Sequence, residues 1–264
     1  MMSRSPEKFK VKYGPCALVA GASEGLGAAY AEALAQRGLN LALLARRKDK
    51  LETLARTLRE KYPVEISCHP VDLGDYGQAK KIIGALDVSI GLLVYNAAYC
   101  PIGLMEETSE DQLAQVVAVN VKAPLLLAKL LSAKMIGNHR GGIVLMSSLA
   151  GTQGSPKLAA YAASKAFNAI LAEGLWQELK PHGIDVIASV AGAVITPGYR
   201  QAQQAKAPGT LTAREVAEQT LKALGKYPIV VPGGVNKIAR FFMGRLLPRT
   251  LAIKLMSANT GSLT

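Results

Sequence analysis

Cysteine is scarce in this sequence, and its arrangement argues against two kinds of site. Cys16, Cys68 and Cys100 are odd in number and far apart, with no C-x-x-C or His-rich spacing. Such a pattern predicts neither a zinc site nor a disulfide framework. We therefore expect reduced cysteines in a cytoplasmic protein, and no metal site.

Long hydrophobic runs are also missing. The run Cys16–Ala22 follows several basic residues and superficially resembles a secretory signal, but it is short and ends among glycines. No stretch approaches the roughly 20 consecutive apolar residues of a membrane-spanning helix. A soluble or peripheral protein is expected.

Acidic residues are absent from positions 219–264, which hold seven bases. The net charge of +12 therefore comes largely from the two ends of the chain, because residues 1–12 add four bases against one acid. A nucleic-acid-binding protein more often has a basic stripe across its fold, so no nucleic-acid partner is expected.

Internal repeats, low-complexity segments and Pro- or Ser-rich linkers are absent as well. Hydrophobic residues make up 50% of the sequence, which is enough for a large buried core. We expect one domain over residues 1–264, with a core over about residues 14–232 and a basic amphipathic extension over 233–264.

Short apolar runs alternate with longer segments of helical spacing. The predicted buried strands are Cys16–Ala20, Leu41–Ala45, Ile66–Val71, Leu92–Tyr95, Ile143–Met146, Val186–Val190 and Ile229–Val231. The predicted amphipathic helices include Ala28–Arg37, Lys50–Lys61, Gln112–Met135 and Tyr161–Leu179. This alternation indicates an α/β protein, either an open doubly wound parallel sheet or a closed eightfold barrel.

A glycine-rich loop distinguishes these folds. Gly21, Ser23, Gly25, Leu26 and Gly27 lie between the first predicted strand and the first helix. Three glycines there permit a tight turn and close approach to a pyrophosphate, whose charge the helix N-terminus binds. An ordinary turn is the alternative. The context favours a Rossmann-like, doubly wound sheet of about seven strands that binds a dinucleotide.

The end of the second predicted strand indicates which dinucleotide binds. NAD-specific enzymes usually place an acid there, whereas this chain has Arg46. A guanidinium pairs well with a 2′-phosphate, which favours NADP over NAD. A solvated Arg46 is the alternative, and Glu24 of the glycine loop would lie near that phosphate.

Polar residues close the next two strands. Asp72 and Leu73 follow the third strand, and Asn96 and Ala97 follow the fourth. Ligands of open α/β sheets bind at the carboxyl ends of the strands, so all four are candidates for cofactor binding. Alone, each pair could be simple turn chemistry.

The candidate catalytic group is a tyrosine and a lysine four residues apart. Tyr161 and Lys165 share one face of a predicted helix, and Ser148 ends the fifth predicted strand. A free phenol has a pKa near ~10, and a neighbouring ammonium lowers it by stabilising the phenolate. Without Ser148, the pair could be an ordinary surface contact.

With these residues in this order, the chain resembles the short-chain dehydrogenase/reductase family, of the short single-domain kind. The resemblance covers about Gly14 to Pro232 and is carried by the glycine loop, Asp72, Asn96-Ala97-Ala98, Asn120, Ser148, Tyr161 and Lys165. It implies an NADP(H)-dependent carbonyl reductase or alcohol dehydrogenase, and a homodimer or homotetramer.

The same resemblance implies a role for each site residue. Tyr161 would donate the proton, Lys165 would lower its pKa and bind the nicotinamide ribose, and Ser148 would bind the carbonyl oxygen. Asn120 would anchor a proton-relaying water. Thr196, which follows Val194 in the loop beside the nicotinamide, would contact the carboxamide.

Three positions depart from the family pattern. Ala20 replaces a frequent Thr, which loses a hydrogen bond within the loop. Ala98 replaces the usual Gly, which is tolerated if the backbone there does not need a positive φ. Ala191 replaces a common Pro, which would loosen the loop beside the nicotinamide.

The substrate is less well defined. Thr196–Thr212 is polar and reads as a long loop, the substrate lid of this family. It contains Tyr199, Arg200, Gln201, Gln203, Gln204 and Lys206. Other expected pocket residues, mainly apolar, are Tyr99, Cys100, Pro101, Thr152, Gln153 and Ala193. An apolar ketone, an aldehyde or a keto-acyl lipid is expected.

Resemblance to bacterial members at Val230-Val231-Pro232-Gly233 and Leu247-Pro248-Arg249 makes lipid carbonyl reduction the leading hypothesis. Residues 236–256 interleave bases with large apolar side chains. Such a segment can lie on anionic lipid, or pack on its own domain or a partner subunit. A non-enzymatic NADP-sensing module is the alternative function, but a sensor does not need Ser148, Tyr161 and Lys165 together.

Overall fold

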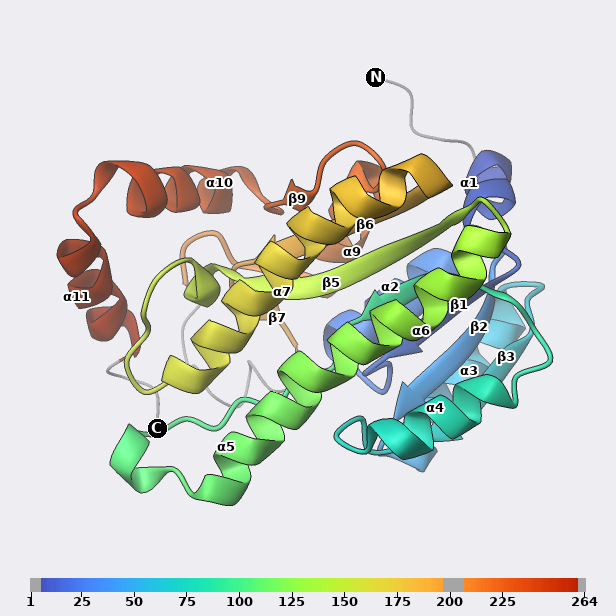
Figure 1. The fold of residues 1–264 in the computed structure, drawn as a ribbon, viewed down its shortest axis with the longest axis horizontal. Coiled ribbons are helices and arrows are strands. Elements are labelled where there is room, and N and C mark those ends of the chain that lie inside the picture. Colours follow the sequence, from blue (N-terminus) through green and yellow to red (C-terminus); the bar gives the residue numbers. More distant parts are fainter. Residues whose placement is uncertain (1–5, 197–206, 261–264) are drawn as a thin grey trace.

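The computed structural model describes residues 6–196 and 207–260. Its centre is a seven-stranded parallel sheet with the strand order β3-β2-β1-β4-β5-β6-β9 (Figure 1). The strands are β1 (Cys16–Ala20), β2 (Asn40–Ala45), β3 (Ile66–Pro70), β4 (Ile90–Tyr95), β5 (Gly141–Ser148), β6 (Ile184–Ala191) and β9 (Ile229–Val230). All seven predicted strands are confirmed, and the sheet is open, as the glycine loop indicated.

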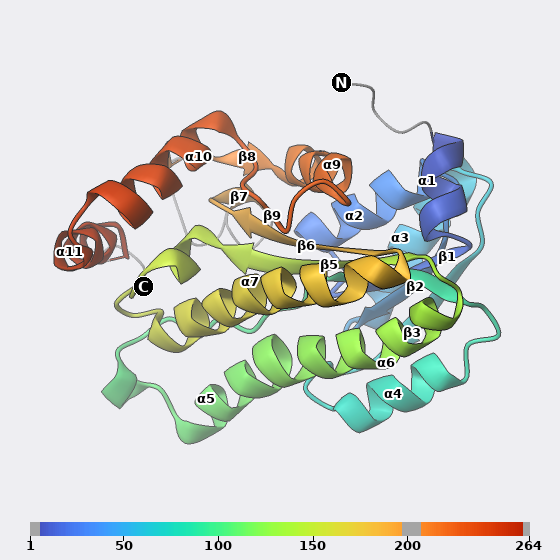
Figure 2. The same ribbon diagram turned by 45° about the horizontal axis from the view of Figure 1, so that its top comes forward.

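Helices cover both faces of the sheet (Figures 1 and 2). The face formed by α1 (Pro6–Tyr13), α2 (Gly25–Ala35), α3 (Lys48–Lys61) and α9 (Ala213–Ala223) encloses one apolar core. The face formed by α4 (Tyr76–Gly84), α6 (Ala123–Gly137) and α7 (Ala159–Leu179) encloses the other. Successive strand residues alternate between the cores: Ala17 and Val19 belong to the first, Leu18 and Ala20 to the second.

One long helical run crosses the outside of the second core. It consists of α5 (Glu110–Val117), a π-helical turn η2 (Ala118–Lys122) and α6. By length and composition, this 28-residue run could span a membrane, which corrects the expectation that no such segment exists. Half of its most apolar window is buried within the protein, as in a core helix.

The N-terminal helix α1 was not predicted from the sequence. It packs through Phe9 and Tyr13, which are both buried. The Tyr13 hydroxyl donates to Asp185 Oδ2 at 2.6 Å, and Lys12 forms an ion pair with the same oxygen at 2.7 Å. These contacts fasten α1 to the start of β6.

The predicted loop Thr196–Thr212 is closed at its base by a small parallel sheet. Strand β7 (Val194–Ile195) pairs with β8 (Leu211–Thr212), so the end of the expected loop is a strand. The expected lid residues Tyr199, Arg200, Gln201, Gln203, Gln204 and Lys206 lie outside the described residues.

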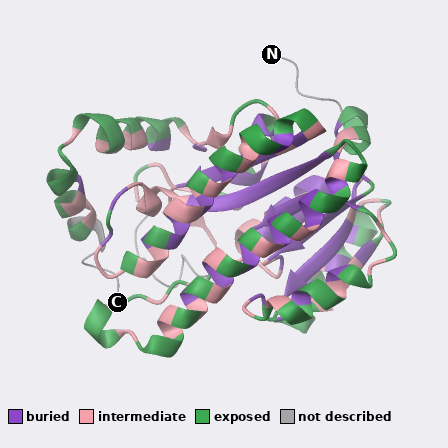
Figure 3. Ribbon diagram, in the orientation of Figure 1, coloured by how far each residue is buried: buried purple, intermediate pink, exposed green. Residues whose placement is uncertain are grey.

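The C-terminal segment is helical and lies against one end of the sheet. Helix α10 (Gly234–Phe241) continues into the π-helical turn η5 (Phe242–Leu246) and is followed by α11 (Arg249–Thr260). Much of α10 and α11 is exposed, whereas the strands are buried (Figure 3). Contact with the rest of the protein includes the buried Ala252 and the Arg249 guanidinium, which donates to the Thr152 carbonyl at 2.7 Å.

Candidate active site

The glycine loop joins β1 to α2 at the carboxyl edge of the sheet. Gly21 has φ +82°, and a Cβ there would lie 2.6 Å from the Ala97 nitrogen. A Cβ on Gly27 would lie 2.0 Å from the Gly21 carbonyl oxygen. Glycine is therefore required at Gly21 for the loop to approach the end of β4, and at Gly27 for α2 to pack on its own loop.

The first turn of α2 has no side-chain cap. Glu24 occupies the N-cap position, but its side chain makes no capping hydrogen bond. The first N–H groups of a helix have no partner within the helix and carry its positive dipole end. This N-terminus is therefore suited to binding an anion such as a pyrophosphate.

Two neighbouring arginines follow β2, and the structure separates their roles. Arg47 Nη2 lies 2.7 Å from Glu24 Oε1 and donates to Ser23 Oγ at 3.0 Å. Lys50 also contacts Glu24, at 2.5 Å. These two bases lower the pKa of Glu24 and neutralise its charge. Glu24, which the sequence placed near the expected 2′-phosphate, is thus already paired with two bases.

Arg46 differs from Arg47, because no hydrogen bond or ion pair engages its guanidinium in the described part of the chain. It lines a cavity of about 440 Å³ together with the glycine loop. The predicted cofactor residues on this cavity are Gly21, Ser23, Gly25, Leu26, Arg46, Asp72, Leu73, Asn96, Ala97, Tyr161 and Thr196. The other three, Gly27, Lys165 and Val194, do not line it.

The cavity also contains residues that the sequence did not single out. Gln115 of α5 and Val119 of η2 form part of its wall. Their only signal in the sequence is an amphipathic helix, which does not say which polar side chain faces a ligand. Asn96 supports the opposite wall, because its Nδ2 donates to the Gly21 carbonyl at 3.0 Å.

Strand β5 and helix α7 hold the predicted catalytic residues together. Lys165 is buried, and its Nζ donates to the Met146 carbonyl at 3.1 Å. Ser147 Oγ donates to the Lys165 carbonyl at 2.7 Å. These two contacts place Ser148, the next residue of β5, beside α7. The Lys165 Nζ lies 5.5 Å from the centre of the Tyr161 ring.

The electrostatics of this pair differ from the sequence expectation. Burial raises the pKa of Tyr161, and a hydrogen bond with Ser148 partly opposes that rise. Burial also lowers the pKa of Lys165 from 10.5 to about 8. The sequence showed the cation but not the burial, and burial is the larger effect here. The tuning role of Lys165 stays a prediction.

Asn120 lies in the π-helical turn η2, where the sequence predicted a continuous helix. It is buried, and its side chain is paired with the Tyr99 backbone in both directions at 2.8 Å. The backbone carbonyl of Asn120 accepts a hydrogen bond from Asn168 Nδ2 at 3.0 Å. The buried Asn168 Oδ1 has no partner within the described residues, so a buried acceptor is available next to Asn120. Water binding there stays a prediction.

Tyr161 also lines a second, smaller cavity. This cavity of about 270 Å³ is bounded by Pro101, Leu104, Met105 and Leu158. Tyr161 therefore lines both the cavity of about 440 Å³ beside the glycine loop, which we call the cofactor cavity, and this smaller, largely apolar cavity. Of the other expected pocket residues, Tyr99 lines the cofactor cavity, and Thr152 lines a third cavity that also contains Ser148.

The loop after β6 is held by a residue that the sequence did not identify. Asn236 of α10 is buried, and its Nδ2 donates to the carbonyls of Gly209 and Pro232 at 3.0 and 2.9 Å. A Cβ on Gly192 would lie 2.7 Å from Asn236 Oδ1. This packing supports the loop beside Ala191. At Ala98, no positive φ is found, so alanine is tolerated there.

Residues 15–207 match the short-chain dehydrogenase family. A 7β-hydroxysteroid dehydrogenase of Clostridium sardiniense is 31% identical over 87% of this chain and 89% of its own length. A very-long-chain 3-oxoacyl-CoA reductase of Phaeosphaeria nodorum is 32% identical over 89% of this chain and 70% of its own. The chain belongs to the short-chain dehydrogenase family of oxidoreductases.

Solved structures agree with this assignment. A structure from a study of 7β-hydroxysteroid dehydrogenase stereoselectivity superposes with a TM-score of 0.88 and 28% identity, covering 94% of this chain and 98% of that one. A short-chain dehydrogenase of Sphingobium yanoikuyae in complex with NADPH has a TM-score of 0.75 and 29% identity, covering 83% and 87%. One relative, in Homo sapiens, is described as inactive; it is 33% identical over 70% of this chain and 57% of its own length.

The depressed pKa of Lys165 predicts a pH-dependent stability. Between about pH 8 and 10.5, Lys165 binds a proton in the unfolded chain but not in the folded protein. The free energy of unfolding of wild type should therefore rise with pH relative to Lys165→Met, by up to about 3 kcal/mol. Urea unfolding of both proteins across this pH range measures the difference, and parallel curves would contradict the burial argument.

Proposed function

We propose that this protein is an NADP(H)-dependent carbonyl reductase or alcohol dehydrogenase whose proton donor is Tyr161. The observation that supports this best is the position of Tyr161, which lines both the cavity beside the glycine loop and the largely apolar cavity. A group there can act on a carbonyl that lies against a bound nicotinamide.

The residues of the larger cavity fit NADP. The backbone at Gly21 and Gly25, which both line the cavity, and the uncapped N-terminus of α2 suit the pyrophosphate. Arg46 has no partner within the described residues, and Glu24 of the glycine loop is neutralised by Arg47 and Lys50. A 2′-phosphate beside Arg46 would therefore meet an available guanidinium without repulsion from a free Glu24 carboxylate. The NADPH complex of the Sphingobium relative supports this choice.

NADPH, when bound, supplies the hydride for carbonyl reduction. Ser148 Oγ accepts a hydrogen bond from the Ala150 N–H at 3.2 Å, so its own hydroxyl can donate to the substrate oxygen. The Tyr161 hydroxyl donates the proton to that oxygen as it gains negative charge. Lys165, when protonated, favours the tyrosinate that remains and passes a proton to it; its ammonium would also bind the nicotinamide ribose. A water anchored beside the buried Asn168 and Asn120 then replaces the proton that Lys165 has given up.

The substrate class follows from the second cavity. Pro101, Leu104, Met105 and Leu158 form an apolar wall beside Tyr161. Relatives named for a hydroxysteroid and for a very-long-chain 3-oxoacyl group both act on large apolar bodies. A bulky apolar ketone, including a keto-acyl lipid, is the substrate that this wall best accommodates.

Replacing the proton donor distinguishes this function from NADP sensing without catalysis. Tyr161→Phe should lower kcat with NADPH and a bulky ketone by about 10²–10⁴-fold, because it removes general-acid catalysis. NADPH affinity should be retained. Tyr227→Phe, at an exposed tyrosine, is the matched control. Equal activity of wild type and Tyr161→Phe would exclude the mechanism.

The choice of cofactor can be tested at Arg46. Arg46→Ala should weaken NADPH binding by about 10- to 100-fold, the usual value of a charge-assisted contact, and leave NADH binding nearly unchanged. Lys48→Ala removes the same charge two residues away and does not line the cavity. Fluorescence titration with both dinucleotides measures the ratio. A wild type without preference for NADPH would refute the role of Arg46.

The outer face of the C-terminal segment suggests peripheral membrane contact. Val235, Ile238, Phe242 and Leu246 share one helical face and are each between 50% and 61% exposed. The surrounding residues 219–264 contain no acid. Pairing with a second copy of this face would bring the basic side chains of two subunits together, which is unfavourable. An anionic lipid surface instead complements their positive charge. Oligomerisation, a trait of the family, would then use other surfaces.

Sedimentation with vesicles tests this contact. Vesicles rich in phosphatidylglycerol should bind the protein at low salt, and binding should weaken as salt screens the bases. Ile238→Ser/Phe242→Ser should bind less than Val117→Ser/Leu125→Ser, which changes two exposed apolar residues on the α5–α6 run. Equal binding of the two variants, or no binding of wild type, would leave the face without a lipid role.

A further inference from the structure

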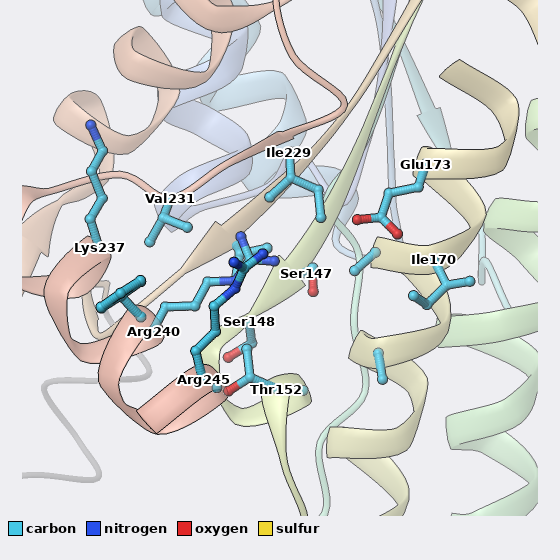
Figure 4. Close-up of a pocket in the computed structure, with 16 residues that line it drawn as sticks. Ser147, Ser148, Thr152, Ile170, Glu173, Ile229, Val231, Lys237, Arg240 and Arg245 are labelled. Atoms are coloured by element: carbon cyan, nitrogen blue, oxygen red, sulfur yellow. The ribbon is translucent and has the colours of Figure 1, made fainter. Parts of the chain in front are cut away.

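A third cavity lies between α7 and the C-terminal helices, and Ser148 is among the residues that line it. Its volume is about 570 Å³, which is within the usual range of ligand sites. One wall is a face of α7 that includes Ala169, Ile170 and Glu173. The other wall is a face of α10 and η5, and the floor includes Ser148 and Thr152 (Figure 4).

The wall formed by α10 and η5 is basic. Arg240 and Arg245 extend toward the same part of the cavity, in front of Ser148, while Lys237 lies nearer the rim (Figure 4). In the residues that the structure describes, neither guanidinium has a hydrogen bond or an ion pair. Glu173 is the one acid on the lining, and it lies on the opposite wall (Figure 4).

Two unpaired guanidinium groups in one cavity favour an anion. A cleft lined by charge of one sign concentrates the electrostatic field, and arginine pairs well with a carboxylate or a phosphate. The remaining lining is largely apolar and includes Ile170, Val231 and Phe241. A ligand that satisfies both kinds of surface is an amphipathic anion.

The geometry points to a subsite for the anionic end of the substrate. The substrate is a carbonyl compound with an apolar body and a carboxylate or phosphate, and Arg240 and Arg245 bind that charged group. Because Ser148 lines the same cavity, a ligand held there can place its carbonyl against the Ser148 hydroxyl. This inference rests on the proposed reductase function and adds the charge of its substrate.

A matched substrate series tests the subsite. Straight-chain oxo-carboxylates, with the ketone at increasing distance from the carboxylate, are assayed with NADPH beside their methyl esters. For the acid of best length, wild type should show a kcat/KM about tenfold or more above that of the ester, mainly through KM. The double variant Arg240→Gln/Arg245→Gln should lose this preference, because the kcat/KM of the acid falls toward that of the ester.

A charge-matched control is available on the same chain. Lys222→Gln/Lys226→Gln also removes two positive charges, but both lysines are exposed and neither lines the cavity. This variant should keep the preference for the acid. Loss of the preference in both double variants would mean that net charge, not the subsite, attracts the acid. An unchanged preference in the arginine variant, or none in wild type, would overturn the inference.

A binding measurement separates this inference from the proposed function. Calorimetry with dodecanoate needs no turnover; wild type should bind it in a salt-sensitive manner, and the arginine variant should not. If no ketone is reduced but dodecanoate binds in this way, the reductase assignment fails and the anion site stands. If dodecanoate does not bind, and sedimentation shows a dimer that the arginine variant dissociates, a second copy occupies the cavity and the inference is wrong.

Discussion

The rest of the site depends on a lysine buried between β5 and α7. The Lys165 ammonium is removed from water and compensated by the Met146 carbonyl, and the Lys165 carbonyl is bound by Ser147. Burying an ammonium is costly unless it is hydrogen-bonded, so strand and helix can approach only in the register that provides these partners. That register fixes where β5 ends and which turn of α7 faces it. Ser148 and Tyr161 are placed as a result.

Three cavities of different character are each lined by one of these two residues. The cofactor cavity is lined by polar backbone and arginine, the cavity at Pro101 is mainly apolar, and the cavity at Arg240 is basic. Tyr161 borders the first two, and Ser148 borders the third. In the proposed reaction, the body and the charge of the substrate would therefore contact residues other than the proton donor.

Most of the sheet and the glycine loop could be predicted because their signals are local. Apolar runs marked each strand, and glycine at Gly21 and Gly27 marked a close backbone approach. The pKa of Tyr161, the pairing of Glu24 and the hold of Asn236 on its loop could not be predicted. Each depends on burial or on contacts between residues that are distant in sequence. The π-helical turn at Asn120 could not be predicted either, because the apolar spacing of the helix continues across it.

Asn236 fastens both sides of the loop that follows β6. Gly192 packs against it before the loop, and the Gly209 carbonyl accepts its amide after the loop. The pairing of β7 with β8 closes the same base. The described residues on the two sides of positions 197–206 are therefore held by the same side-chain amide of α10. A shift of the C-terminal segment would consequently be transmitted to the carboxyl end of β6, which couples two parts of the chain that are distant in sequence.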